Sequence, residues 1–162
     1  MRSITQSKIV ALCMGDFARG LIGGIITTYL LTFFIPTKAD TTLPQFFLAA
    51  SLTIAIIRGI GTVVDAITDP WVANLTDNCK SKLGRRIPFM RWSAIPYAAC
   101  CLMIFFPPAN GPSVVNAIWV GVLMILYYLC STLYHIPHSA LQAEVVTDPA
   151  KRVFLYTINS LF

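Results

Sequence analysis

Five charged side chains lie inside long apolar runs of the sequence: Asp16, Arg19, Arg58, Asp65 and Asp69. At the centre of a membrane-spanning helix, each such group costs about 2.5–3.5 kcal/mol on insertion scales. Charged groups at that depth face the interior of a helix bundle or a water-filled cavity, and they mark the paths of ions and substrates. These residues are therefore the first candidates for ligand binding.

Arg58, Thr62, Asp65 and Asp69 follow one another at steps of four, three and four residues, which places them on one face of a helix. Two carboxylates one turn apart, with a hydroxyl nearby, suit a hard cation or a shared proton. A purely structural role is disfavoured, because the two like charges repel until something positive binds. We interpret Arg58 as an interior partner of Asp65 rather than as a solute contact.

A second polar stripe, also with steps of three or four residues, predicts the lining of a cavity: Tyr128, Ser131, Thr132, His135, Ser139 and Gln142. His138 lies off this stripe, and we interpret it as structural. Two alternatives stay open. Asp16 and Arg19 could neutralise each other, and His135 could be a hydrogen-bonded interior histidine without further function.

The depth of these residues in the membrane points to one layer. Depth is counted from the charged residues that mark the cytoplasmic ends of the runs, which are Lys8, Asp77 and Glu144. At about 1.5 Å per helical residue, Asp16, Asp69 and His135 each lie roughly 12–13 Å from these ends. Asp65 and Thr132 lie one turn deeper. Groups from separate spans thus converge near the membrane midplane, where transporters build their binding sites.

The elements that must position these side chains are long apolar runs. Each of four runs can supply the roughly 20 residues that cross a hydrocarbon core. The runs are continuous rather than alternating, which favours helices over a barrel. We expect an all-α, polytopic transmembrane helix bundle over residues 1–162, incomplete, with spans at about Ile9–Ile35, Gln45–Leu75, Phe89–Pro107 and Val114–Gln142 and a fifth that begins near Val153.

Composition excludes a water-soluble enzyme. Of the 162 residues, 56% are hydrophobic and 12% are charged, whereas soluble domains have about 25% charged residues. The sequence has no zinc spacing, nucleophile–base pair or phosphate loop, so we expect neither an enzyme nor a cofactor. The five cysteines lie in the spans or the loop after the second span, and they suggest no disulfide framework.

The net charge of +5 indicates membrane orientation rather than nucleic-acid binding, because the basic residues form short clusters beside the apolar runs. Clusters occur before the first span, after the second and after the fourth: Arg2, Lys8, Lys80, Lys82, Arg85, Arg86, Lys151 and Arg152. The opposite side has only Lys38, which Asp40 offsets. We expect a multi-pass protein of the cell (inner) membrane whose N-terminus is cytoplasmic.

Three segments of the chain match a known family. They are the stretch from Asp65 through Asp69 and Pro70 to the Gly84-Arg85-Arg86 loop, the Gly15-Asp16-Phe17-Ala18 segment, and the segment from Tyr134 to Leu141 with Glu144. In order and spacing, the chain resembles the glycoside–pentoside–hexuronide:cation symporters, the melibiose permease-like branch of the major facilitator superfamily.

The resemblance implies a twelve-helix carrier of which this chain is the opening, N-terminal part. The residues matching the coupling-cation site, for sodium or a proton, are Asp65, Asp69 and Thr132. The matching sugar contact is Asp16, and we add His135, Tyr128, Ser131 and Ser139 from the polar stripe. The loop with Asp77, Gly84, Arg85 and Arg86 matches a gating motif. The implied partners are a small solute, the bilayer and the remaining helices.

Three positions depart from the melibiose branch. His135 stands in place of a second sugar-binding aspartate, Ser139 in place of a tryptophan, and Thr62 in place of an arginine. Melibiose itself is therefore not expected, and another glycoside, a uronide or a non-sugar solute stays open. The alternative is a non-transporting accessory subunit or remnant, since a chain that stops inside the fifth span cannot alternate access alone. We expect a truncated symporter that is inactive by itself.

Overall fold

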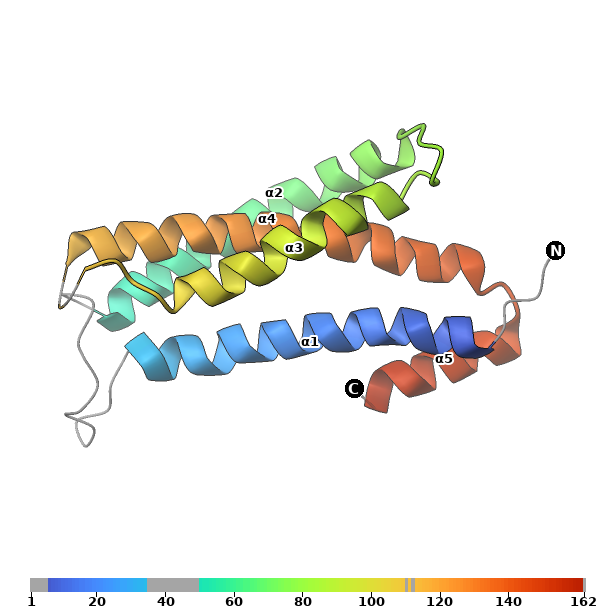
Figure 1. Ribbon diagram of the computed structural model, residues 1–162, viewed down its shortest axis with the longest axis horizontal. Coiled ribbons are helices and arrows are strands. Elements are labelled where there is room, and N and C mark those ends of the chain that lie inside the picture. The colour runs from blue at the N-terminus through green and yellow to red at the C-terminus, as the bar shows by residue number, and fades with distance from the viewer. Residues whose placement is uncertain (1–5, 35–49, 110, 112, 162) are drawn as a thin grey trace.

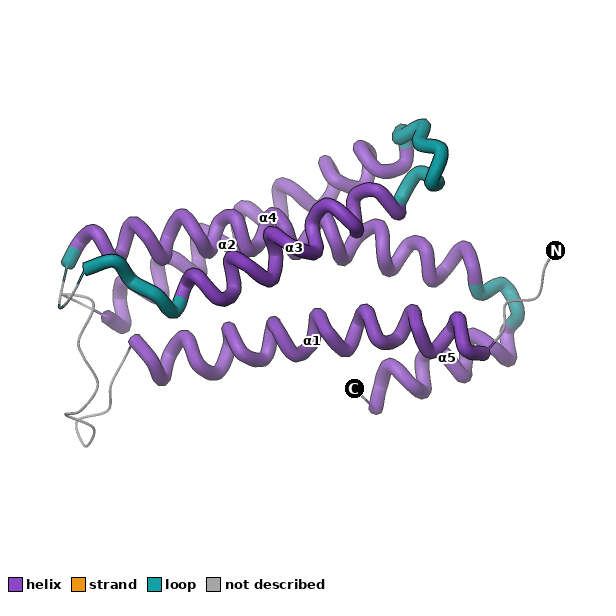
Figure 2. The backbone as a smooth tube through the Cα atoms, in the orientation of Figure 1, coloured by secondary structure: helices purple, strands orange, loops and turns teal. Residues whose placement is uncertain are grey.

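The computed structural model describes residues 6–34, 50–109, 111 and 113–161, and these residues form helices and loops without a strand (Figure 2). The helices are α1 (Gln6–Phe34), α2 (Ala50–Asp77), α3 (Ile87–Ile104), α4 (Val114–Val145) and α5 (Pro149–Leu161). The first four are long and apolar enough to cross a membrane. The expected all-α, multi-pass bundle is confirmed.

The helices form a three-helix layer with a neighbouring pair. α2 and α3 both pack along α4, whereas α1 lies beside this layer and α5 packs against the N-terminal half of α1 (Figure 1). The α2–α3 loop, the C-terminal end of α4 and the start of α1 lie at the same end of the molecule.

Two apolar clusters hold this arrangement. At one end, α1 packs against α3 and α4 through Leu30 and Phe34, and Tyr97 stacks on Tyr127 with 5.1 Å between ring centroids. At the other end, Cys13 of α1 packs against Leu155 of α5. Along α1, Asp16 and Arg19 lie between these two clusters. Many large apolar residues on the outer faces remain exposed, as expected of helices that lipid surrounds.

Several predicted boundaries shift. The fifth helix begins at Pro149 rather than near Val153, because Asp148 Oδ1 accepts a hydrogen bond from the Ala150 backbone amide at 3.1 Å and proline fits the first helical position. The third ends at Ile104 rather than Pro107, since Pro107 and Pro108 cannot continue it. Expectations that rest on Arg2, Ile35, Lys38, Asp40 or residues 45–49 fall outside the described residues.

Candidate functional site: two polar clusters between the helices

The first polar cluster joins α2 to α4. Thr132 Oγ1 donates a hydrogen bond to Asp65 Oδ1 at 2.6 Å. Thr132 is buried and Asp65 is half-buried, so the bond lies inside the helix layer. The structure therefore brings together two of the residues that the sequence assigns to a cation site. These two residues are 67 positions apart along the chain and lie on different helices.

Asp69 lies one turn from Asp65 on α2, toward the α2–α3 loop. In the described part of the chain it has no hydrogen bond or ion pair. No group of three or more histidine, cysteine or acidic residues among the described residues could hold a metal ion. Two carboxylates and a hydroxyl supply the oxygen atoms that hard cations prefer, and either carboxylate could take up a proton instead.

The expected pairing of Arg58 with Asp65 is wrong: no ion pair joins them in the described structure, where both lie on α2. The two residues are about 10 Å apart along the helix axis, which leaves a poor geometry for a direct contact. Thr62 also turns away from the carboxylates, because its hydroxyl donates to the Arg58 carbonyl at 3.0 Å.

The second polar cluster surrounds Asp16 of α1 with side chains of two other helices, α4 and α5. Asp16 Oδ2 accepts hydrogen bonds from Gln142 Nε2 of α4 and from Asn159 Nδ2 of α5, the latter at 3.0 Å. On its other side, His138 Nδ1 of α4 lies 3.3 Å from Asp16 Oδ1. Asp16 thus ties α1 to α4 and α5 at one point.

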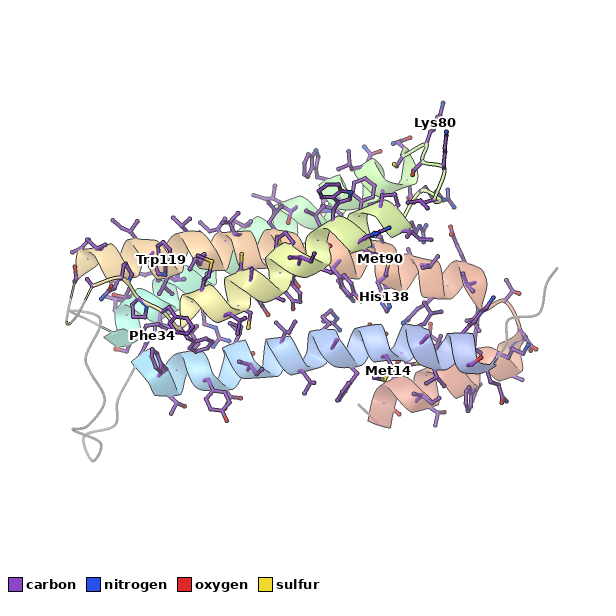
Figure 3. All side chains as sticks on the ribbon, in the orientation of Figure 1. Met14, Phe34, Lys80, Met90, Trp119 and His138 are labelled. Carbon is purple, nitrogen blue, oxygen red and sulfur yellow. The ribbon has the colours of Figure 1, made fainter. Side chains whose placement is uncertain are left out.

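His138 has a larger part than the sequence suggested. It is 2% exposed, stacks on Tyr134 with centroids 5.5 Å apart, and lies between α4 and α1 (Figure 3). A Cβ atom at Gly15 would come within 2.7 Å of His138 Nε2 and 2.8 Å of the Tyr134 hydroxyl. Gly15 therefore lets α1 approach α4 closely enough for Asp16 to contact His138.

Beside Asp16 lies an open cavity of about 330 Å³, within the range of small-molecule sites. α1 contributes Asp16, Arg19 and Gly20, α4 contributes His135, Ser139 and Gln142, and α5 contributes Asn159. Asp16, His135 and Ser139, which the sequence singled out, thus share one cavity. Gln142 was assigned to the polar stripe only.

Two predicted solute contacts do not line this cavity. Tyr128 packs instead against α2, where a Cβ atom at Gly61 would lie 2.1 Å from the Tyr128 ring. Ser131, one turn from Tyr128 on α4, is also absent from the lining residues. Both residues lie farther from the C-terminal end of α4 than His135 does. At that level α4 packs against α2 and not against α5.

Asn159 was missed by sequence reasoning. Its amide donates to Asp16, but the predicted start of the last helix gave no reason to turn that side chain toward α1. The available signal was an amide side chain between Val153 and Phe162, where the other polar residues, Thr157 and Ser160, carry only hydroxyls.

Asp16 and Arg19 form no ion pair in the described structure, although their charges act on each other. Three nitrogen atoms, from Gln142, Asn159 and His138, already surround the Asp16 carboxylate. Asp16 and Arg19 therefore make no direct contact, and the alternative in which their two charges neutralise each other stays a prediction.

The predicted gating residues form an ion-pair network where α2 and α4 end. Arg86 Nη2 lies 3.1 Å from Asp77 Oδ1 of α2 and 3.0 Å from Glu144 Oε1 of α4. Arg85 also pairs with Glu144. Gly84 has a φ of +97°, a conformation that favours glycine and turns the loop back toward α3. The network connects α2, α4 and the loop before α3.

Comparisons with known proteins agree with this arrangement. A family model described as MFS/sugar transport protein matches residues 11–162. The inner membrane symporter YicJ of Escherichia coli is 28% identical over 88% of this chain and 29% of its own length. The isoprimeverose transporter of Lactiplantibacillus pentosus is 25% identical over 96% of this chain and 30% of its own length.

A more distant group includes the sodium-dependent lysophosphatidylcholine symporter 1 of Xenopus tropicalis, which is 36% identical over 60% of this chain and 19% of its own length. The chain spans about a third or less of the length of these curated relatives. No solved structure matches it. Because the family model covers nearly the whole chain, this protein belongs to the MFS/sugar transport protein family.

Proposed function

We propose that this chain forms the N-terminal part of a secondary active transporter that couples the entry of a sugar or glycoside to a sodium ion or a proton. The observation that carries the proposal is the pair of polar clusters on α4. Thr132 contacts Asp65 of α2, and the neighbouring turns of α4 face Asp16 of α1. One helix thus links a candidate cation site to a candidate solute cavity.

The cation site consists of Asp65, Asp69 and Thr132. Without a cation, the two carboxylates repel each other across one helical turn. A sodium ion or proton removes this repulsion and draws Asp69 toward Asp65. The names of the relatives support cation coupling and a sugar-like solute, since they include a sodium-dependent symporter and an isoprimeverose transporter.

The solute binds in the cavity beside Asp16. Because cation and solute sites share α4, cation binding changes the position of His135 and Ser139, and with it the solute affinity. Thermodynamic linkage then requires that the solute change the cation affinity by the same factor. This reciprocity is what makes the two ligands move together.

The network of Asp77, Arg86 and Glu144 acts as a gate at the end of α2 and α4. While its ion pairs are closed, the ends of the helices stay together. Rocking of this bundle against the remaining helices of a twelve-helix carrier opens the network and exposes the sites to the other side.

Basic residues cluster at the end of the molecule that holds this gate, namely Lys80, Lys82, Arg85, Arg86 and Arg152. The positive-inside rule then places this end, and the N-terminus, in the cytoplasm. In this proposal the protein is a carrier of the inner membrane and not an enzyme.

The test is uptake into membrane vesicles that contain the full-length product of the gene encoding this chain. We expect a sodium or a proton gradient to drive accumulation of a labelled glycoside, and Asp65→Asn to abolish accumulation. Asp148→Asn is the matched control, because Asn caps a helix as well as Asp does. Equal accumulation with and without both gradients would contradict the proposal.

A further inference from the structure

A groove larger than the cavity beside Asp16 lies on the outer side of α3, where the α2–α3 loop meets that helix. This α3 groove is open, has a volume of about 500 Å³ and is lined by residues of the loop and of α3: Ser81, Leu83, Pro88, Arg91, Trp92 and Ile95. The residues from α3 stand at positions i, i+3, i+4 and i+7, which share one side of a helix. The buried residues of α3, such as Tyr97 and Cys101, lie on the opposite side. The α3 groove therefore faces away from the bundle and from both polar clusters.

The walls of the α3 groove are apolar and exposed. Trp92 is 81% exposed and Ile95 is 78% exposed. The same side of α3 continues with Leu102 and Met103, which are also exposed. From Trp92 to Met103 this apolar stripe is roughly 16 Å long along the helix axis, about half of a hydrocarbon core of roughly 30 Å. The stripe therefore matches the depth that the acyl chains of one leaflet fill.

The polar end of the α3 groove lies at the depth where a membrane meets water. Arg91 and Trp92 stand four and five residues after Ile87, where α3 begins, which is about 6–8 Å along the axis. Tryptophan is enriched at membrane–water interfaces, and arginine extends its charged head from such a position to the surface. The order along α3, charged group first and apolar stripe second, is that of a phospholipid in one leaflet.

Basic side chains surround this end of the α3 groove. From Lys80 to Arg91 the sequence has five basic residues and no acidic residue. Figure 3 shows Lys80 on the α2–α3 loop, at the far end of the molecule. Neither Lys80 nor Arg91 takes part in an ion pair of the described residues, and Arg86 already engages the neighbouring carboxylates of Asp77 and Glu144. The region thus has an excess of positive charge that no described side chain neutralises.

The hydrogen-bonding groups at this end are donors without acceptors. The Arg91 guanidinium and the Trp92 indole can only donate, and neither makes a hydrogen bond in the described part of the chain. Ser81 Oγ accepts from the Leu83 backbone amide at 3.3 Å, which leaves the hydroxyl hydrogen for another acceptor. A phosphate group supplies several acceptor oxygens with negative charge, and arginine binds it through two parallel hydrogen bonds.

We propose that the α3 groove binds one anionic phospholipid of the leaflet that surrounds this end of the molecule. The lipid phosphate accepts from Arg91, Trp92 and Ser81, and an acyl chain lies along the apolar stripe from Trp92 to Met103. A free phosphate ion would leave the apolar walls exposed. A zwitterionic phospholipid brings a cation that the basic residues repel. The proposal stands apart from the cation and solute sites and does not depend on them.

The experiment uses phospholipids with brominated acyl chains, which quench tryptophan fluorescence on contact. The full-length carrier is reconstituted in phosphatidylcholine vesicles in which a rising fraction of lipid is brominated phosphatidylglycerol or brominated phosphatidylcholine. The signal of Trp92 is the difference between the unaltered carrier and Trp92→Phe, so that the other tryptophans cancel. Trp71, which is exposed on α2 and lies outside the groove lining, is measured in the same way through Trp71→Phe as the control.

We expect half-quenching of Trp92 at an about fivefold or more lower fraction of brominated phosphatidylglycerol than of brominated phosphatidylcholine, since one basic residue near anionic lipid accounts for about that factor. Trp71 should show no such preference. Arg91→Gln should reduce the preference at Trp92 about fivefold. Lys8→Gln is the matched control, because it removes an exposed basic residue at the same end of the molecule but outside the groove lining. An unchanged midpoint of thermal unfolding shows that each variant is folded.

Four results would overturn the proposal. Equal quenching of Trp92 by both lipids would remove the preference for an anionic headgroup. An equal effect of Lys8→Gln and Arg91→Gln would replace the groove by a general attraction to the basic surface. Absence of quenching by either lipid would mean that other helices of the carrier cover this side of α3. Recovery of Trp92 fluorescence on addition of inorganic phosphate, at constant ionic strength, would assign the donors to a free phosphate ion.

Discussion

The contact between α2 and α4 and the cavity between α1, α4 and α5 differ in the atoms that they present. Around Asp65 the groups are oxygens, two carboxylates and a hydroxyl, with Asp69 left without a partner. Around Asp16 the groups are mostly nitrogens, and the carboxylate is fully engaged. In the described structure, Asp69 of the first region has no hydrogen bond or ion pair, whereas the Asp16 carboxylate of the second region faces three nitrogen atoms.

This difference indicates that the two carboxylates that contact α4, Asp65 and Asp16, have different roles. In the proposed function, Asp65 binds the cation with the oxygen that Thr132 does not contact. Asp16 positions side chains of α4 and α5, and it shapes the cavity more than it offers a free acceptor. Variants of matched chemistry in the two regions should therefore fail in different assays.

The largest effect is expected from Asp16→Asn. The amide keeps one oxygen for Gln142 and Asn159 but loses the negative charge and the second oxygen, which lies beside His138, so about 3 kcal/mol of interaction is lost. We expect solute affinity to fall roughly 100-fold while cation binding at Asp65 persists without solute. Calorimetric titration with each ligand checks this. Loss of cation binding with unaltered solute binding would contradict the assignment of Asp16 to the solute cavity.

Thr132→Val should act in the opposite sense. It keeps the size of the side chain but removes the hydroxyl that donates to Asp65, which weakens the oxygen cluster. We expect cation affinity to fall about tenfold, in line with one hydrogen bond to a charged group. Thr32→Val, an exposed position on α1, is the control. A sodium titration that gives the same affinity for both variants would argue against a cation site at Asp65.

Gly61→Ala tests the packing that holds α2 against α4. The added methyl would lie 2.1 Å from the Tyr128 ring, and overpacking of this kind costs about 1–3 kcal/mol. Gly59→Ala on the same helix meets nothing within 4 Å, so it should leave stability unchanged or slightly raise it. The midpoints of thermal unfolding in detergent compare the two. Equal midpoints would show that α2 does not pack on Tyr128 as described.

The smallest effect concerns the ion-pair network. Arg86 is buried and contacts two carboxylates, whereas Arg85 and Glu144 are largely exposed. Arg85→Gln should change stability by at most about 1 kcal/mol, as exposed pairs do, and Arg86→Gln should change it more. Unfolding in a denaturant series would measure both variants. An equal or larger effect of Arg85→Gln would contradict the assignment of Arg86 as the bridging residue.

Much of the fold could be predicted from the sequence, because a membrane-spanning helix needs a long continuous run of apolar residues. The four apolar runs and their order could be predicted, and so could the shared layer of Asp65 and Thr132, since helical rise fixes depth. Asp16, His135 and Ser139 share a cavity for the same reason.

The remaining features depend on how helices rotate against each other. The helical spacing of polar residues on α4 placed His135 on the polar stripe and left out His138. In the structure, however, the close approach of α1 at Gly15 brings His138 beside Asp16. The same rotation moves Tyr128 toward α2. The position of Asn159 depends on the packing of α5 against α1, and the start of α5 on the cap at Asp148, which hydrophobicity alone does not reveal.

The central claim is that the cluster at Asp65 and the cavity at Asp16 are coupled through α4. The most direct measurement is the solute affinity of the full-length carrier at rising sodium concentrations and at several pH values. We predict that solute affinity rises with one of the two cations, and that cation affinity rises by the same factor when solute is present. A solute affinity that stays constant across sodium concentration and pH would contradict the account.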